Sequence, residues 1–422
     1  MMRMKTLTFA CIALTVNTFQ QTVLCRDAGG ASVAIFGDSL ATAAGAHPAL
    51  AFDSDVLWDI LKGERHLSET APLAVHDYLG SGGNPAMGRP LNLLPGSREY
   101  RGAFGWVFQA AMDRLADDYF NAPWISWGFL SARKSGVPAE RILIAAHNGA
   151  RMSDLSRQAD RVLDHLKGQL PDRSYLLFTG NDLCGAHMHA MTTAESFRIS
   201  LSSGLKYMII NGKAAPAGSE IFVMAYLGVT QLLIKEELLD KRIQAFGHDM
   251  TCRQLRARSY QPRPTESKGQ RHQESLYFSH LIPPDPASYC PTLFALPMLA
   301  KADDASFLPF LNKGSQSHGE VSPVDREAGY LEGPVRQRVD EMISVLSGRI
   351  RQFREVAEQV VEEVSEWSKH HVPDSRIRVR YVSETEQISF DPDDIAADCF
   401  HLSPYGQLKI AKALDTSLSK AP

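Results

Sequence analysis

Five short segments rich in apolar and β-branched residues alternate with segments of helical pattern, and this alternation constrains the fold most strongly. The apolar segments are too short for buried helices, so they predict strands. Apolar residues recurring every three or four positions predict helices over 154–170 and 193–211. Strands that alternate with helices form a parallel sheet covered on both faces. The predicted strands are 33–36, 141–146, 175–179, 221–227 and 377–382.

Two long insertions interrupt this alternation, at about 46–140 and 229–332, within a single domain expected to span 30–422. After the second insertion, apolar residues recur every three or four positions over 335–367, which predicts a long helix. A coiled-coil seam and a helix packed on a sheet produce the same pattern. We expect this helix to pack within the chain and to break near Gly348.

The composition limits the classes of partner. Of the 422 residues, 44% are hydrophobic and 22% are charged, which is enough apolar sequence for a folded core. The formal net charge of -4 gives no electrostatic attraction to nucleic acid or to an anionic membrane. No apolar run reaches the length of a membrane-spanning helix, so we expect no transmembrane span.

The N-terminus has the pattern of a secretory signal peptide. Arg3 and Lys5 precede an apolar stretch over 7–16, which is too short to cross a bilayer. We therefore predict a signal peptide over about 1–25 and a mature protein that is secreted, periplasmic or held in the cell envelope. A lipid anchor at Cys25 is the less favoured alternative, because the bulky Leu24 stands where lipidation sites usually have a small residue.

Export to an oxidising compartment would permit disulfides. Four cysteines allow three pairings, and sequence alone does not choose among them. We expect at least one disulfide and favour Cys252 with Cys290, which would bridge the second insertion. The four cysteines in the body of the chain are Cys184, Cys252, Cys290 and Cys399.

Ser39 is the candidate nucleophile. The predicted strand over 33–36 stops at Gly37, so Ser39 lies at the carboxyl end of a strand, where open α/β sheets bind ligands. The alanines at 41, 43 and 44 are expected to begin a helix whose N-terminus favours negative charge beside Ser39. Gly-Asp-Ser is also common in ordinary turns and helix caps, so this stretch alone does not establish a site.

His401 is the candidate base. Asp398 precedes it by three residues in the same short loop, close enough to accept the Nδ1 proton and fix the tautomer of the imidazole. Ser403 and Pro404 are the residue types that begin a helix, as N-cap and first helical residue, and such a helix would hold the loop. The simpler alternative is a histidine in a surface loop.

Three groups are candidate donors to an oxyanion: the backbone N–H of Ser39, the backbone N–H of Gly149 and the side-chain amide of Asn181. Each follows a predicted strand, although a turn at a strand end is the simpler explanation of each one alone. Asp38 and Asp182 are expected to brace these loops. A further pair, His187 and His189, lacks the carboxylate or cysteine partners of a metal site, and we expect no metal.

The chain contains in order Gly37-Asp38-Ser39-Leu40, Gly149, Asn181 within Gly-Asn-Asp, and Asp398-x-x-His401. Together these strings resemble the four sequence blocks of the SGNH, or GDSL, serine hydrolases. The longer strings Gly-Asn-Asp-Leu-Cys at 180–184 and Asp-Cys-Phe-His at 398–401 resemble the phospholipase B branch. The resemblance covers the predicted core strands, but not most of the first insertion or the long helix.

This resemblance implies a three-layer, flavodoxin-like α/β fold whose five-stranded parallel sheet has the order 2-1-3-4-5. It also implies ester hydrolysis through an acyl-serine intermediate. Ser39, Asp398 and His401 would then be catalytic, and Ser39, Gly149 and Asn181 would bind the oxyanion. The α/β-hydrolase motif Gly-x-Ser-x-Gly is absent around Ser39, which argues against that other fold.

We therefore expect an exported serine hydrolase that acts on lipid or phospholipid acyl esters without a metal or organic cofactor. A carbohydrate O-acetylesterase or a lipid acyltransferase would use the same catalytic set. The remote alternative is a surface-binding protein without catalysis. Tryptophans of the first insertion offer a surface for contact with lipid, although core packing is the default for most of them.

Overall fold

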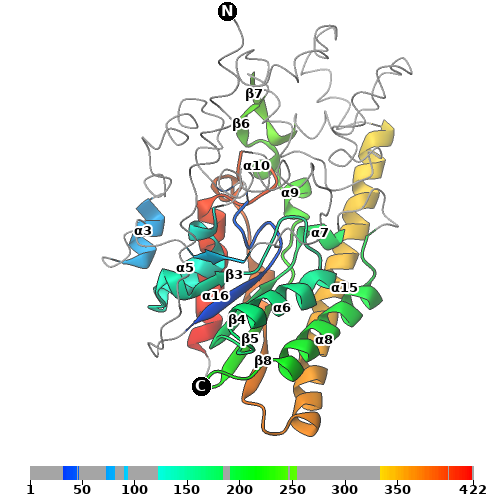
Figure 1. The fold of residues 1–422 in the computed structure, drawn as a ribbon. Helices are drawn as coiled ribbons and strands as arrows, with labels where there is room; N and C mark the ends of the chain where they lie inside the picture. The colour runs from blue at the N-terminus through cyan, green and yellow to red at the C-terminus, as the bar shows by residue number, and fades with distance from the viewer. Residues whose placement is uncertain are drawn as a thin grey trace, which may run out of the picture. The chain divides into compact units, whose positions relative to one another are not determined.

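A parallel β-sheet forms the centre of the protein (Figure 1). The computed structural model describes residues 32–44, 46, 73–80, 90–93, 122–183, 191–245, 248–253, 333–397 and 399–420. The expected signal peptide, Cys25 and large parts of both predicted insertions therefore lie outside the described residues.

All five predicted strands are present in the sheet. The strand order is β2-β3-β1-β4-β5-β8, with parallel pairing between neighbours, so the five predicted strands follow the order 2-1-3-4-5. A short strand from the first predicted insertion, β2, extends the sheet beside β3. The strands are β1 (Val33–Gly37), β2 (Leu91–Asn92), β3 (Ile142–Ile144), β4 (Arg173–Leu177), β5 (Ser219–Met224) and β8 (Ile377–Val382).

The first strand, β1, lies inside the sheet between β3 and β4. Its residues Val33 to Phe36 are completely buried. A parallel strand covered by helices on both faces needs apolar side chains at every position, not only at alternate ones. This explains the uninterrupted apolar run, and it places the residues after Gly37 between the carboxyl ends of two neighbouring strands.

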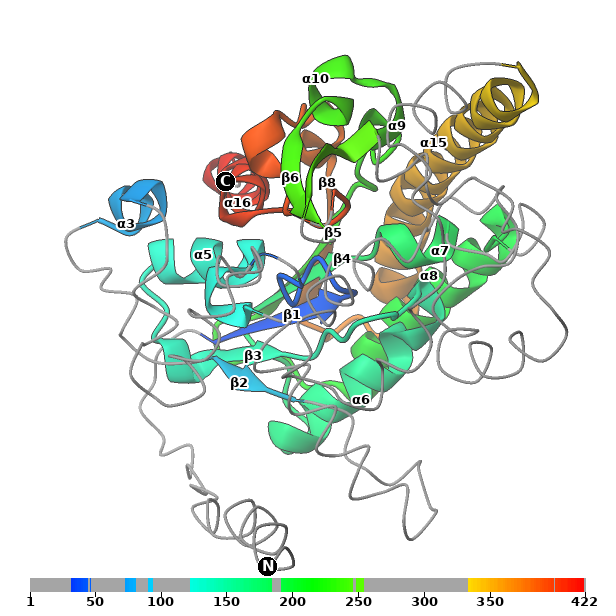
Figure 2. The ribbon, with the colours of Figure 1, turned by 90° about the horizontal axis from the view of Figure 1, so that it is seen from above.

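Helices cover both faces of the sheet (Figure 2). On one face, α5 (Trp127–Lys134) packs against α16 (Pro404–Ser419). On the other lie α6 (Leu155–His165), α8 (Ala194–Asn211) and α15 (Gly333–His371). The chain is thus an α/β protein with a parallel sheet between helical layers. Trp124 and Trp127 are buried, as expected for core residues.

The long helix α15 packs within the chain, as predicted, and contacts both α8 and β8. Phe353 stacks on Phe197 of α8 with ring centroids 4.3 Å apart, and its centroid lies 5.2 Å from that of Tyr226. The predicted break near Gly348 is wrong, because the helix continues through this residue. Burial of Leu346 and Ile350 on either side outweighs the modest cost, about 1 kcal/mol, of a glycine inside a helix.

Two short antiparallel strands, β6 (Arg242–Ala245) and β7 (His248–Thr251), form a separate sheet within the second predicted insertion. They follow the short helices α9 (Gln231–Ile234) and α10 (Glu236–Leu239). None of the helices in the described ranges combines the length and apolar character that crossing a membrane would require.

Phe353→Ala should lower the free energy of unfolding by about 3–5 kcal/mol, because it removes a fully buried ring from the contact between α15 and α8. Glu355→Ala is the matched control, since this side chain is exposed on the same helix. Its effect should stay within about 0.5 kcal/mol. Chemical denaturation of both variants measures the difference, and equal effects would mean that α15 does not pack on the sheet domain.

Candidate active site

Ser39 lies in a tight turn that follows β1 directly. Backbone hydrogen bonds run from the N–H groups of Ala41 and Ala44 to the carbonyl oxygens of Asp38 and Ser39, at 3.0 and 2.8 Å. The helix expected to begin at Ala41 is not formed. Ala43 has a φ of 53°, a left-handed conformation that ends any right-handed helix at this point. Ser39 is therefore presented by a turn, not by a helix N-terminus.

The backbone at Gly37 fixes the direction in which this turn leaves the sheet. Gly37 has a φ of 148°, and a Cβ atom there would clash with the carbonyl oxygen of Leu177 on β4. Gln158 of α6 binds both backbone groups of Gly37: its Oε1 accepts the N–H at 2.9 Å, and its Nε2 donates to the carbonyl at 2.8 Å. Gly37 is thus held by the adjacent strand and by a helix.

Asp38 braces the turn from inside the protein. Its carboxylate accepts hydrogen bonds from the N–H of Leu40 at 3.0 Å and from the N–H and hydroxyl of Thr179 at 2.8 and 3.2 Å. Burial raises the pKa of this carboxyl above its usual value, while these hydrogen bonds and the nearby His401 oppose the shift. Asp38 thereby connects the end of β1 to the end of β4.

His401 is close to Ser39, with its Nε2 atom 3.1 Å from the serine Oγ atom. The histidine is 2% exposed, and the serine is partly exposed. An imidazole nitrogen at this distance can accept the hydroxyl proton. The structure thus brings together two residues that are 362 positions apart in the sequence. Asp398, the predicted orienter, lies outside the described residues.

The loop that carries His401 folds back on itself. The N–H of Ala396 donates to the carbonyl of His401 at 2.7 Å, and the N–H of Ser403 donates to the carbonyl of Asp394 at 2.8 Å. The downstream end is fixed as predicted, because Ser403 caps α16 and Pro404 is its first residue. The imidazole therefore projects from a short loop that is closed at its base.

The three predicted oxyanion donors follow three adjacent strands. Ser39 follows β1, Gly149 follows β3 and Asn181 lies just beyond β4, in the short helix α7 (Gly180–Leu183). The carboxyl ends of neighbouring parallel strands meet at one edge of a sheet, so the topology gathers these residues there. Within the described part of the chain, the N–H groups of Ser39 and Gly149 donate to no protein acceptor.

Side-chain hydrogen bonds connect the loops that carry these donors. Thr42 donates its hydroxyl to Asn148 Oδ1 at 2.9 Å, which joins the Ser39 turn to the loop after β3. Asn181 Nδ2 donates to the carbonyl of Ala150 at 3.0 Å, which joins that loop to α7. An amide nitrogen carries two protons, so Asn181 retains one for a ligand. Gly149 is exposed with a φ of 77°, a conformation that favours glycine.

Asp182 holds the same two loops together from the buried side. Its Oδ2 accepts the N–H of Met152 at 2.9 Å, while its buried Oδ1 has no hydrogen-bond partner among the described residues. Burial raises the pKa of Asp182 to about 6, and the nearby Asp38 raises it further. Hydrogen bonds from Met152 and Thr192 and the positive charge of Arg151 act in the opposite direction. Asp182 therefore braces the two loops, as the sequence suggested, although its burial makes ionisation of the carboxyl unfavourable.

Sequence reasoning missed two buried glutamines that support the site. Gln158 holds Gly37, while Gln407 of α16 accepts the N–H of Trp127 at 3.0 Å and donates to the carbonyl of Leu40 at 3.2 Å. Both side chains are fully buried. A polar residue at an apolar position of an amphipathic helix was the available signal, because such a side chain must bind buried polar groups.

The predicted disulfide is present with a different pairing. Cys252 is bonded to Cys399, with Cα atoms 5.5 Å apart, and not to Cys290. The expected pair would have bridged the second insertion, but the tertiary fold brings the end of β7 to the His401 loop. Cys184, Cys290, His187 and His189 lie outside the described residues. Among the residues that are described, no group of three or more histidines, cysteines and carboxylates could hold a metal ion.

Comparison with known proteins adds no relative: no protein-family model matches the chain, and no curated protein matches it.

The free energy of unfolding should fall between pH 4 and pH 6 because of Asp182. Its folded-state pKa of about 6 exceeds the ordinary value of 3.8 for an aspartate, so the folded protein keeps a proton that the unfolded chain has lost. Raising the pH through this window therefore destabilises the folded state, by on the order of 2–3 kcal/mol.

Asp182→Asn should lack this loss, since the amide oxygen can still accept the Met152 N–H. Denaturation at pH 4 and pH 7 measures the effect. The free energy of unfolding of the variant should increase relative to that of the wild type as the pH rises. A difference between the two proteins that does not change with pH would contradict the assignment.

Proposed function

We propose that the protein is an exported serine hydrolase of the SGNH type, resembling the phospholipase B branch, that cleaves acyl esters of lipids or phospholipids. The observation that carries the proposal is the 3.1 Å contact between His401 Nε2 and Ser39 Oγ. It occurs at the carboxyl edge of the sheet, where the backbone N–H groups of Ser39 and Gly149 donate to no acceptor among the described residues. A nucleophile, a base and oxyanion donors are the parts that acyl transfer requires.

In the first half of the reaction, Ser39 Oγ attacks the ester carbonyl carbon while its proton passes to His401 Nε2. The carbonyl oxygen becomes an oxyanion, which accepts hydrogen bonds from the N–H groups of Ser39 and Gly149 and from the amide of Asn181. The tetrahedral intermediate then breaks its bond to the alcohol oxygen. His401 returns the proton to that oxygen, so the alcohol leaves and the acyl group stays on Ser39.

In the second half, water attacks the acyl-serine carbonyl and gives its proton to His401. The same donors bind the second oxyanion. Its collapse releases the carboxylic acid, and the proton returns from His401 to Ser39 Oγ. Asp398 would orient the imidazole, as the sequence predicts.

Export is supported by the signal-like N-terminus and by the disulfide between Cys252 and Cys399. Disulfides persist in oxidising compartments and are rare where glutathione keeps thiols reduced. The substrate class rests on the sequence strings that resemble phospholipase B, and a screen against phospholipids, short p-nitrophenyl esters and acetylated sugars tests it. Cleavage of acetylated sugars alone would replace the lipid substrate with a carbohydrate ester.

Ser39→Ala should lower the hydrolysis of a p-nitrophenyl ester by at least about 10⁴-fold while the protein stays folded, because the nucleophile is lost. His401→Ala should lower the rate nearly as much, and the double variant little further, since the two residues act as one unit. Ser203→Ala, an exposed serine of α8, is the control and should retain full activity. Activity near the wild-type level in Ser39→Ala would refute the mechanism.

Asn181→Ala should lower kcat by about 10²–10³-fold and leave KM nearly unchanged, because its amide binds charge that develops only in the transition state. The variant also loses the hydrogen bond to Ala150, which should cost about 1 kcal/mol of stability.

Asn211→Ala provides the matched control, since its Nδ2 donates to the Tyr207 carbonyl at the same 3.0 Å distance, on α8. It should have a normal kcat. A large fall in Tm for Asn181→Ala, with kcat within a few-fold of wild type, would make Asn181 a structural residue.

A further inference from the structure

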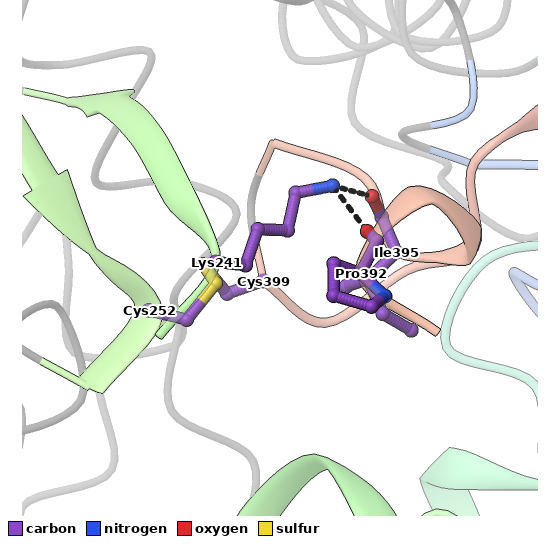
Figure 3. Close-up of a disulfide and its surroundings, with 5 residues drawn as sticks. All are labelled: Lys241, Cys252, Pro392, Ile395 and Cys399. Atoms are coloured by element: carbon purple, nitrogen blue, oxygen red, sulfur yellow. Dashed lines mark hydrogen bonds between the residues drawn. A yellow bond between two sulfur atoms is a disulfide. The ribbon is translucent and has the colours of Figure 1, made fainter. Parts of the chain in front are cut away.

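The loop that carries His401 is attached to the β6–β7 segment, residues 241–253, by a covalent bond. Cys399 lies two residues before His401, and Cys252 lies directly after β7. Both cysteines are buried, at 0% and 1% exposure, so the disulfide belongs to the interior (Figure 3). It joins positions 147 residues apart in the chain.

A second attachment lies earlier in the same loop, before Cys399. Lys241, just before β6, donates from its Nζ atom to the carbonyl of Pro392 at 2.7 Å and to the carbonyl of Ile395 (Figure 3). The two attachments are linked to each other, because the N–H of Cys252 donates to the carbonyl of Lys241 at 2.9 Å. One short segment therefore holds the His401 loop at its entrance and close to its tip.

The β6–β7 segment is itself anchored. The guanidinium of Arg253 pairs with Asp240 at 2.9 Å and with Glu236 of α10. The Arg253 side chain is only 8% exposed, so these ion pairs are shielded from solvent on the arginine side. The segment is thus fixed to α10 through Arg253, and it holds the His401 loop through Lys241 and Cys252.

The stretch that leads into the His401 loop is held by a further lysine from the same region. Lys235 donates to the Ser389 hydroxyl at 2.8 Å and to the Phe390 carbonyl at 2.7 Å. Three carbonyl groups, those of Phe390, Pro392 and Ile395, thus receive hydrogen bonds from the two lysines that flank α10. Carbonyl groups bound in this way cannot shift singly, because each would lose a charge-assisted hydrogen bond.

We propose that the β6–β7 segment is a positioning element for His401, acting through Lys241 and the Cys252–Cys399 disulfide. This inference rests on the proposed function, in which His401 must lie within hydrogen-bond distance of Ser39. In the proposed mechanism His401 is the residue of this loop that exchanges a proton with Ser39, so Lys241 and the two cysteines act on its placement and not on the reacting atoms. Because the covalent attachment is a disulfide, the reaction rate becomes dependent on the thiol redox state of the surroundings.

The physical reason is the sensitivity of proton transfer to distance. A displacement of about 1 Å in a reacting group can lower a rate by about 10²-fold. Substrate binding depends on groups other than the imidazole, so a misplaced His401 should lower kcat and leave KM unchanged. A segment that served only the general stability of the fold would change Tm without this selective effect on kcat.

The first test replaces Lys241. Lys241→Met removes both hydrogen bonds to the loop and should lower kcat for a p-nitrophenyl ester by about 10-fold to 10²-fold, with KM unchanged. Lys241→Arg keeps a cation with several donors and should restore kcat to within a few-fold of wild type. Lys412→Met, an exposed lysine of α16, is the control for the substitution itself and should have no effect.

The second test uses reduction of the folded wild type at 25 °C. A phosphine reductant should lower kcat by about 10-fold while the circular dichroism spectrum is retained. Cys252→Ser should have the lower kcat from the start and should not respond to the reductant. An unchanged kcat of the wild type after reduction would overturn the inference. A loss of activity on reduction in Cys252→Ser, equal to that of the wild type, would overturn it as well.

Amide hydrogen exchange gives a measurement that does not need activity. The N–H of Ala396, bound to the His401 carbonyl, should exchange at least about 10-fold faster after reduction and in Lys241→Met. If the wild type is inactive but shows this faster exchange, the proposed function is refuted, while the inference that the segment holds the His401 loop in place is supported. Unchanged exchange and unchanged kcat in an active enzyme would refute the positioning role alone. If Lys241→Met does not fold, the reduction experiment decides.

Discussion

The close approach of Gly37 to the Leu177 carbonyl is the constraint on which the candidate site depends. No side chain fits at this position, and Gln158 of α6 binds both backbone groups of the glycine. The chain therefore leaves β1 in one direction, and Ser39 is presented two residues later. The buried Asp38 carboxylate then ties the turn to Thr179 at the end of β4. The buried strand β1 and the buried side chains of Gln158, Asp38 and Thr179 thus determine the position of the Ser39 hydroxyl.

The remaining parts of the site are held in the same way, by buried polar contacts behind loops at the sheet edge. Asp182 and Asn181 join the end of β4 to the loop after β3, while Gln407 joins α16 to the Ser39 turn. Burying a polar group is costly unless it is hydrogen-bonded, and the Asp182 oxygen without a partner in the described part of the chain represents part of that cost. The His401 loop arrives from the far end of the chain and is fixed by the α16 cap, Lys241 and a disulfide. Reactive groups on rigid elements need little reorganisation during a reaction.

Much of this arrangement could be predicted from the sequence, because it follows from local patterns. The strand order was implied by the resemblance of the motifs to a known family, the pairing of Ser39 with His401 followed from motifs at or beyond strand ends, and α15 followed from its apolar period. Three predictions depended on tertiary context and were wrong. Ala43 takes a left-handed conformation that composition does not reveal, so residues 41–44 form a turn and not the start of a helix. Burial carries α15 through Gly348, and the fold brings Cys252 to Cys399, which spacing along the chain cannot indicate.

The central claim is that Ser39 is a nucleophile activated by His401 beside a prepared oxyanion site. A fluorophosphonate tests it most directly, because it reacts with an activated serine and leaves a tetrahedral phosphorus in place of the acyl intermediate. Peptide mass mapping should place one phosphonyl group on Ser39 in the wild type. A crystal structure of this adduct should place the phosphonyl oxygen about 2.7–3.1 Å from the backbone nitrogens of Ser39 and Gly149 and from Asn181 Nδ2. A label on another residue, no label at all, or an oxygen directed away from these donors would contradict the account.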